Sequence, residues 1–188
     1  MKKLLLILLC LPLLFTTCKK EDEEPNSTGF TKEIGQGHQG GVIFWLDGNG
    51  GGLILSVQDQ AIAEWGCAGS LLGVNGTAIG TGAQNTIDIV AGCATPGTAA
   101  YICDTLTLNG YSDWFLPSKD ELNKMYLNYH VPGIQVNMSS GWYWSSTEYS
   151  YWNGVSMVDK AWQQRFQNGT QDNGDKWNPM YVRAIRAF

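Results

Sequence analysis

The sequence contains few of the residues that form catalytic sites. It has two histidines, His38 and His130, which are far apart and lack metal-ligand spacing. No P-loop and no G-x-S-x-G nucleophile elbow occur in it. Charged residues make up only 15% of the chain and form no basic patch, which argues against nucleic acid as a partner. We therefore expect a protein that is not an enzyme.

Three near-matches to known motifs fail on their surroundings. GQGHQG (35–40) has the letters of a dinucleotide-binding loop, but it precedes a predicted strand and opens no helix. DGNGGG (47–52) begins like a calcium loop and lacks the later acids, so a hairpin turn explains it better. EPN (24–26) is a calcium- and sugar-binding tripeptide of C-type lectins, but here it lies before the predicted domain. We predict no cofactor and no metal site, and calcium binding has no motif that supports it.

The N-terminus lacks a hydrophobic run long enough to span a membrane. Lys2 and Lys3 precede an apolar stretch, 4–15, which is shorter than the roughly 20 residues of a spanning helix. Residues 1–17 are predicted to be a secretion signal, and Cys18 resembles the lipidated cysteine of a bacterial lipoprotein. Thr17 departs from the Gly, Ala or Ser usual at that position. The alternative is an ordinary signal peptide with Cys18 unmodified.

Residues 18–29 are predicted to be a disordered tether. The run KKEDEE (19–24) contains nothing to bury and should be solvated. It resembles the lysine-then-acid export tag of surface lipoproteins in Bacteroidetes-type bacteria. This resemblance implies an outer-membrane protein that faces the cell exterior and contacts the membrane only through its lipid anchor.

Residues 30–188 are long enough for one domain with its own core. Three cysteines fall in it, and an oxidising compartment makes a disulfide plausible. Cys67 and Cys93 lie in glycine-rich surroundings and are the candidate disulfide, although sequence alone does not establish a pairing. Cys103 lies on the apolar face of a predicted helix, where a buried free thiol fits.

Hydrophobic patterning predicts helices that lie between β segments. A glycine-rich turn between two apolar runs indicates a hairpin over 40–60. Helices are predicted at 85–91 and 98–108. The later strands are predicted at 142–150, in KAWQQRFQNGTQ, and at 181–188.

The stretch GYSDWFLPSKDEL (110–122) resembles an active site in composition but is better explained as a helix start. Ser118 and Glu121 have the spacing of a capping box, in which each side chain bonds the backbone N–H of the other residue. Asp120 and Glu121 then belong to the first helical turn, where acids face the positive end of the helix dipole. We interpret both acids as structural.

Six motifs in order resemble the Lcl C-terminal domain family, which is named after a collagen-like adhesin of Legionella. They are GGVIFWLD, WGC, GYSDWFLPSKDELNKMY, YWSSTE, AWQQRFQNG and YVRAIRAF. The resemblance implies an α+β, C-type-lectin-like fold: two helices packed on a small, mostly antiparallel sheet, paired N- and C-terminal strands, and long irregular loops. Formylglycine-generating enzymes share a related fold but use a cysteine pair near the C-terminus, and this chain has no cysteine after Cys103.

The eight tryptophans are the main candidates for binding. Trp45, Trp114, Trp144 and Trp162 lie in apolar alternation and are predicted to be core. Trp152 and Trp177 lie in polar loops beside amides and acids, a combination that suits stacking on a sugar ring and bonding its hydroxyls. The candidate ligand-binding set is Trp152, Asn153, Asp159, Asp175, Trp177 and Asn178. Alternatively, the two tryptophans anchor their loops on the sheet.

These observations predict a surface lipoprotein whose non-catalytic domain recognises glycan or extracellular matrix, as an adhesin does. The named adhesin is associated with glycosaminoglycans, but three arginines and a net charge of −5 fit a neutral polysaccharide better. A structural or assembly component of the cell envelope is the alternative. An enzyme related to the formylglycine-generating type is a third, weaker one.

Overall fold

The computed structural model describes residues 31–152 and 155–188, with the backbone alone for Tyr151 and Trp152. Lys32–Phe188 form one compact unit. The predicted signal peptide, the tether, Cys18 and Asn153 lie outside the described residues.

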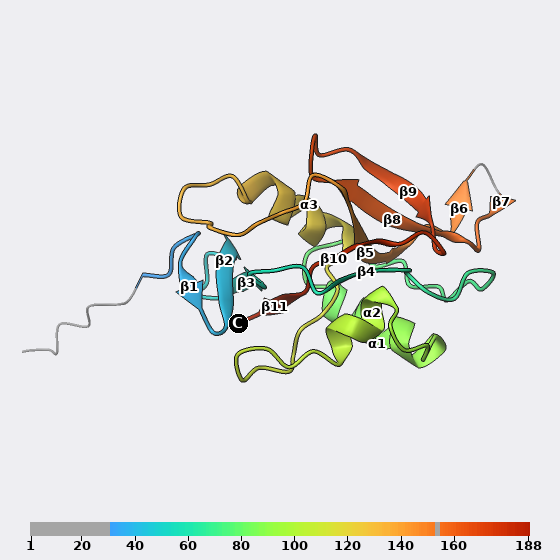
Figure 1. Ribbon diagram of the computed structural model, residues 1–188, viewed down its shortest axis with the longest axis horizontal. Helices are drawn as coiled ribbons and strands as arrows, with labels where there is room; N and C mark the ends of the chain where they lie inside the picture. Colours follow the sequence, from blue (N-terminus) through green and yellow to red (C-terminus); the bar gives the residue numbers. More distant parts are fainter. Residues whose placement is uncertain (1–30, 153–154) are drawn as a thin grey trace, which may run out of the picture. The chain divides into compact units, whose positions relative to one another are not determined.

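The first of two main sheets contains four antiparallel strands (Figure 1). Their order is β1 (Gly37–His38), β2 (Gly41–Leu46), β3 (Gly52–Leu55) and β11 (Ile185–Ala187). The predicted hairpin is β2–β3. Its turn is closed by Asp47, whose Oδ1 accepts the N–H groups of Asn49 at 2.7 Å and Gly51 at 3.0 Å. The DGNGGG stretch is therefore a turn.

The second sheet contains five strands. Their order is β4 (Ala61–Ala63), β10 (Met180–Val182), β5 (Trp142–Glu148), β8 (Lys160–Arg165) and β9 (Gln171–Asp175). Only β10 and β5 run parallel. A separate two-stranded ribbon joins β6 (Tyr151–Trp152) to β7 (Val155–Ser156). Two mostly antiparallel sheets with helices confirm the predicted α+β class.

The C-terminal segment connects the two sheets, and the prediction of one strand over 181–188 is wrong. The chain leaves the second sheet after β10 and enters the first as β11, which pairs with β3 (Figure 1). Between them lies Arg183, whose buried guanidinium donates to Asp59 Oδ1 at 2.8 Å and to the Ser56 carbonyl at 2.7 Å. These bonds satisfy the buried cation where the strand breaks. The family resemblance implied paired N- and C-terminal strands, and the structure places both in one sheet, where β11 pairs with β3 and not with β1.

Three helices are present in the described residues, where the family resemblance implied two. They are α1 (Gly82–Gly92), α2 (Ala99–Asp104) and α3 (Lys119–Asn128). The second is shorter than the predicted 98–108, because it ends at Thr105, whose hydroxyl donates to the Tyr101 carbonyl at 2.8 Å. Helices α1 and α2 lie side by side in Figure 1.

Helix α3 begins as the sequence predicts. Ser118 Oγ accepts the Glu121 N–H at 3.3 Å, and Glu121 Oε2 accepts the Ser118 N–H at 2.7 Å. Both halves of the capping box are present, and an N-cap of this kind is worth about 1 kcal/mol.

Among the tryptophans whose side chains the structure describes, three are fully or almost fully buried: Trp65, Trp114 and Trp144. All three satisfy their indole N–H within the fold, because Trp65 donates to the Ser145 carbonyl at 2.8 Å, Trp144 to the Ala63 carbonyl at 3.0 Å and Trp114 to the Tyr111 carbonyl at 3.1 Å. The core prediction was right for Trp114 and Trp144. Trp45 is half-buried but packs against the core, whereas the prediction was wrong for Trp162, which is half-buried and does not join the core of the described residues.

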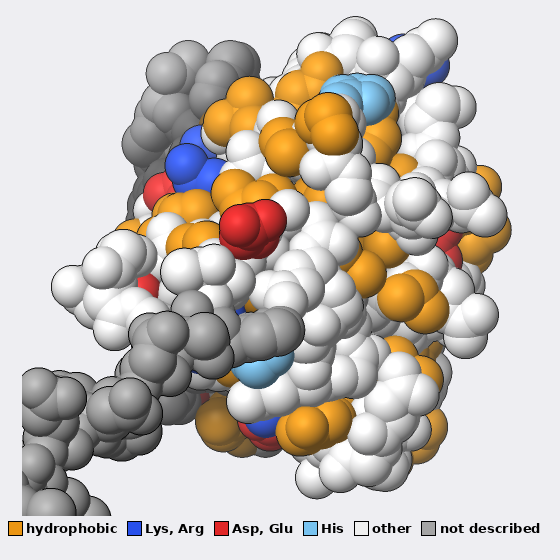
Figure 2. Space-filling view, turned by 90° about the vertical axis from the view of Figure 1, so that its left-hand side faces the viewer, with side chains coloured by type: hydrophobic (Ala, Val, Ile, Leu, Met, Phe, Trp, Pro, Cys, Tyr) orange, Lys and Arg blue, Asp and Glu red, His pale blue; other side chains and the backbone are white. Residues whose placement is uncertain are grey.

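On the face shown in Figure 2, apolar side chains form separate groups among uncharged polar ones, and charged side chains are sparse. This pattern agrees with the low charged content of the sequence. Among the described residues, no helix is both long and apolar enough to cross a membrane.

Candidate binding site

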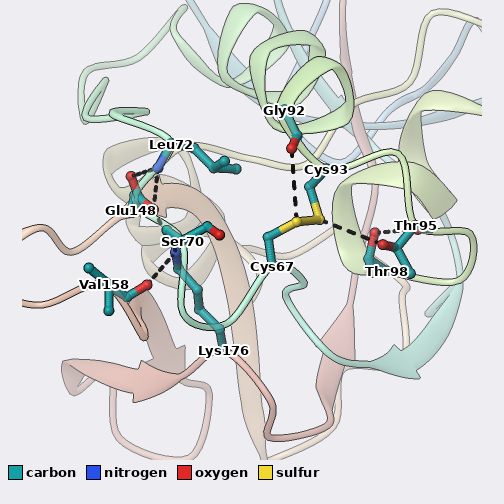
Figure 3. The surroundings of a disulfide bond; sticks show 10 residues. All are labelled: Cys67, Ser70, Leu72, Gly92, Cys93, Thr95, Thr98, Glu148, Val158 and Lys176. Carbon is teal, nitrogen blue, oxygen red and sulfur yellow. Dashed lines mark hydrogen bonds and ion pairs between the residues drawn. A yellow bond between two sulfur atoms is a disulfide. The ribbon is translucent and has the colours of Figure 1, made fainter.

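A glycine-rich loop, 67–81, leads from the second sheet to α1 and forms one wall of the candidate site. Its first residue is tied to the end of α1 by a disulfide between Cys67 and Cys93, the predicted pair (Figure 3). The bond closes a stretch of 26 residues. Cross-linking over this separation restricts the unfolded chain and stabilises the fold by about 2–4 kcal/mol.

A buried ion pair holds the same end of the loop. Lys176 and Glu148 have fully buried side chains, and Nζ lies 2.5 Å from Oε1. Lys176 also donates to the carbonyls of Ser70 at 2.7 Å and Val158 at 2.8 Å (Figure 3). All three ammonium protons therefore have acceptors, as a buried cation requires.

The Glu148 carboxylate also binds the loop backbone. It accepts the N–H of Leu72 at 3.0 Å, that of Gly73 at 2.7 Å and, more weakly, that of Val74 at 3.4 Å. Because β5 carries Glu148, these bonds tie the loop to the sheet, and the carboxylate has no oxygen left for a ligand.

Glu121 anchors the other end of the loop. Beyond its role in the capping box, its Oε1 accepts the Gly80 N–H at 2.7 Å. Gly82 packs so closely that a side chain there would overlap Glu121 Oε2. Burial raises the pKa of Glu121 above its usual value, and hydrogen bonds from the backbone and from Ser118 partly oppose the shift.

Between these two anchors lies an open depression of about 220 Å³. The middle of the loop contributes Asn75 and Thr77, and the sheet contributes Trp162 on β8. The full lining is Asn75, Thr77, Thr147, Glu148, Tyr149, Ser150 and Trp162. Glu148 is the single carboxylic acid among them, and its carboxylate is held internally by Lys176. The lining therefore offers a ligand no free ionised acid.

Aromatic rings form the apolar part of the depression. The Tyr149 and Trp162 rings have centroids 5.1 Å apart and meet at 79°. The Lys119 ammonium lies over the Trp162 ring, 3.8 Å from its centroid. Both rings are half-buried, so each keeps part of its surface exposed.

Several polar groups of the depression are free to bind a ligand. Ser150 Oγ donates to Asn75 Oδ1 at 3.1 Å, which leaves the Asn75 amide nitrogen without an acceptor in the described part of the chain. The side-chain hydroxyls of Thr77 and Tyr149 likewise make no hydrogen bond within residues 31–152 and 155–188. Amide and hydroxyl groups beside an aromatic ring are suited to binding sugar hydroxyls.

The sequence-predicted site residues lie mainly near the paired ends of β8 and β9. Trp177 is 49% exposed. Asp175 pairs with Lys160 at 2.5 Å and its carbonyl accepts the Asn178 N–H at 2.9 Å. Asp159 accepts the Gly69 N–H. The two aspartates thus make contacts within the fold. Of Trp152 the structure describes only the backbone, in β6.

Sequence reasoning missed the depression because it placed Trp162 in the core. Pairing of β8 with β9 sets Trp162 opposite Asn173 and Lys160 opposite Asp175. Since alternate residues of a strand share a face, Trp162 lies on the same face of β8 as the polar residue Lys160. The polar neighbours two positions away, Lys160 and Gln164, were the available signal.

The fold and the site together define an α+β domain with a polar, partly aromatic depression at its surface that presents no free carboxylate. No group of three or more potential metal-ligating side chains occurs among the described residues.

The chain belongs to the Lcl C-terminal domain family, whose model matches residues 59–186. The match includes the glycine-rich loop, all three helices and the whole depression. A search of curated proteins finds none that matches this chain.

Proposed function

We propose that this protein is a non-catalytic binding domain that recognises an uncharged glycan, displayed outside the cell on a lipid anchor. One observation carries the binding part of the proposal. The depression combines exposed aromatic surface with amide and hydroxyl groups that have no partner among the described residues, and it presents no free ionised acid. These are the contacts that a sugar ring and its hydroxyls require.

The arrangement of ionisable groups supports a non-catalytic role. Lys176 is bonded to Glu148 and Arg183 to Asp59, so the strongest buried charges are neutralised inside the fold. Cys103 is buried, and burial raises the pKa of its thiol, which disfavours the reactive thiolate. None of these groups is free to act as a nucleophile or base.

The location is inferred from the sequence. A basic start, a short apolar run and Cys18 are the parts of a lipoprotein signal, and an acidic stretch follows them. Labelling of the protein with radioactive palmitate in cells should be lost on Cys18→Ser. Unchanged labelling of that variant would contradict the proposed anchor.

An array of neutral oligosaccharides, probed with the full-length chain, tests the binding proposal. We expect saturable binding that weakens about two- to tenfold on Trp162→Ala, which corresponds to the roughly 0.5–1.5 kcal/mol typical of aromatic contacts. Trp177→Ala is the matched control, because it removes an exposed indole outside the depression. A thermal melt of each variant shows whether the fold is retained.

The other outcomes separate the alternatives. If Trp177→Ala abolishes binding and Trp162→Ala does not, then the site lies among the sequence-predicted residues at the end of β9, Asp175, Trp177 and Asn178, rather than at the depression. If the unmodified chain binds no oligosaccharide, the glycan proposal is wrong, and a structural role in the cell envelope becomes the better explanation.

A further inference from the structure

Lys119 is fixed beside the depression by its backbone. Its N–H donates to Thr147 Oγ1 at 2.9 Å, and its carbonyl accepts from Gln171 Nε2, also at 2.9 Å. Thr147 belongs to the lining of the depression. The lysine backbone is thus held at the rim, while its long side chain keeps several rotatable bonds.

The helix does not explain a lysine at this position. Lys119 is the first residue of α3, and a cation at a helix N-terminus faces the positive end of the dipole. In the described ranges, no carboxylate oxygen lies within 4.0 Å of its Nζ. The contact that the ammonium does make is with the Trp162 ring, at 3.8 Å from the centroid.

We infer that Lys119 is a displaceable occupant of the Trp162 ring face, and that an incoming sugar must push its side chain aside. This inference rests on the proposed function. Stacking of a sugar requires an open ring face, and the ammonium covers one face of the indole. The displaced side chain remains tethered at the rim, because its backbone is held by Thr147 and Gln171.

A tethered cation also sets specificity. A protonated amino sugar would bring a second positive charge next to Lys119, and like charges repel. An uncharged sugar meets no such repulsion. Lys119 therefore makes the site favour neutral saccharides over cationic ones of the same size.

Two substitutions separate these two effects. Lys119→Ala opens the ring face and removes the charge. Lys119→Met removes the charge but leaves a flexible chain that can still cover the ring. Lys124→Ala is the matched control, because Lys124 belongs to the same helix but, in the described residues, makes no cation–π contact with the indole.

The binding experiment is isothermal titration of the full-length chain. The probes are a panel of neutral tetrasaccharides of glucose, mannose, galactose and N-acetylglucosamine, and a glucosamine tetramer as the cationic probe. Displacing an exposed cation–π contact is weakly unfavourable, so Lys119→Ala should bind the best neutral tetrasaccharide about two- to fivefold more tightly. Lys119→Met should leave that affinity near the original value and improve binding of the glucosamine tetramer. Lys124→Ala should change neither.

A spectroscopic readout follows the lysine directly. Reductive ¹³C-dimethylation keeps the charge, and the Lys119 methyl signal, identified by its absence in Lys119→Met, should be shifted by the indole ring current. Saturating tetrasaccharide should move that signal towards the position of a free lysine. A signal that stays shifted in the presence of bound sugar would overturn the inference.

The two proposals fail in different ways. Equal or weaker tetrasaccharide binding by Lys119→Ala overturns the role of Lys119 and leaves glycan binding intact. Absence of binding by both the original chain and Lys119→Ala overturns the glycan site itself.

Discussion

The two ends of the loop 67–81 are both held by a buried glutamate, but the two glutamates are compensated differently. Glu148 accepts backbone N–H groups and also contacts the Lys176 ammonium. Glu121 accepts the N–H groups of Ser118 and Gly80 and is paired with no cation in the described residues.

The difference shows two ways of anchoring an irregular loop on a scaffold. An ion pair with full hydrogen bonding depends on both partners, since removing one leaves an unpaired buried charge. A buried carboxylate that is held only by neutral donors has no cation to offset the loss of water around its charged form. Burial therefore raises the pKa of Glu121. Between the two anchors, Asn75 and Thr77 are held at the depression.

Removing one partner of the Glu148–Lys176 ion pair should have the largest effect on the free energy of unfolding. Glu148→Ala leaves the Lys176 ammonium buried without its acid and three backbone N–H groups without acceptors. We expect a loss of about 3–5 kcal/mol in the free energy of unfolding, measured by urea denaturation. The double variant Glu148→Gln, Lys176→Met should recover much of this loss. A loss below about 1 kcal/mol for Glu148→Ala would show that the pair does not anchor the loop.

Removing the disulfide should have the next largest effect, at the same end of the loop. Cys67→Ser combined with Cys93→Ser should lower the free energy of unfolding by about 2–4 kcal/mol, since the unfolded chain gains freedom. Cys103→Ala is the control for loss of a thiol that forms no disulfide. If the double variant is as stable as the original chain under oxidising conditions, the cross-link contributes nothing to this fold.

The smallest effect should come from substituting Glu121. We expect it to change how the free energy of unfolding depends on pH. Its folded-state pKa lies above the unfolded value of about 4.5, so the folded protein binds the proton more tightly. Stability from this group is therefore greatest below about pH 4.5 and declines as the pH rises through the folded pKa. Glu121→Gln should flatten this slope in urea titrations across pH 4–7, whereas Glu64→Gln, at an exposed position, should retain it. An unchanged slope in Glu121→Gln would contradict the assignment.

Local features of the fold were predictable from sequence, because neighbouring residues determine them. The capping box needs Ser118 and Glu121 three positions apart, and the β2–β3 turn needs Asp47 followed by glycines. The break between β10 and β11 was not predictable from alternation alone. It depends on Asp59, which is 124 positions away from Arg183 in the chain.

The candidate site was only partly predictable for the same reason. The sequence suggested aromatic residues beside polar ones and selected Trp152 and Trp177 from loop composition, and that choice stays a prediction. Trp162 was assigned to the core because its own segment alternates. Its position at the depression depends on the cross-strand partner Asn173 and on Asn75 from a distant loop.

The sequence by itself determined the α+β class, the family and the start of α3, since each depends on short-range pattern or overall content. Only the tertiary structure decided which tryptophan lies beside free amide and hydroxyl groups and which buried acid is matched by a cation. Those outcomes depend on contacts such as Glu148 with Lys176 or Lys119 with Trp162, between residues that come together only when the strands of the second sheet pair and α3 packs on them.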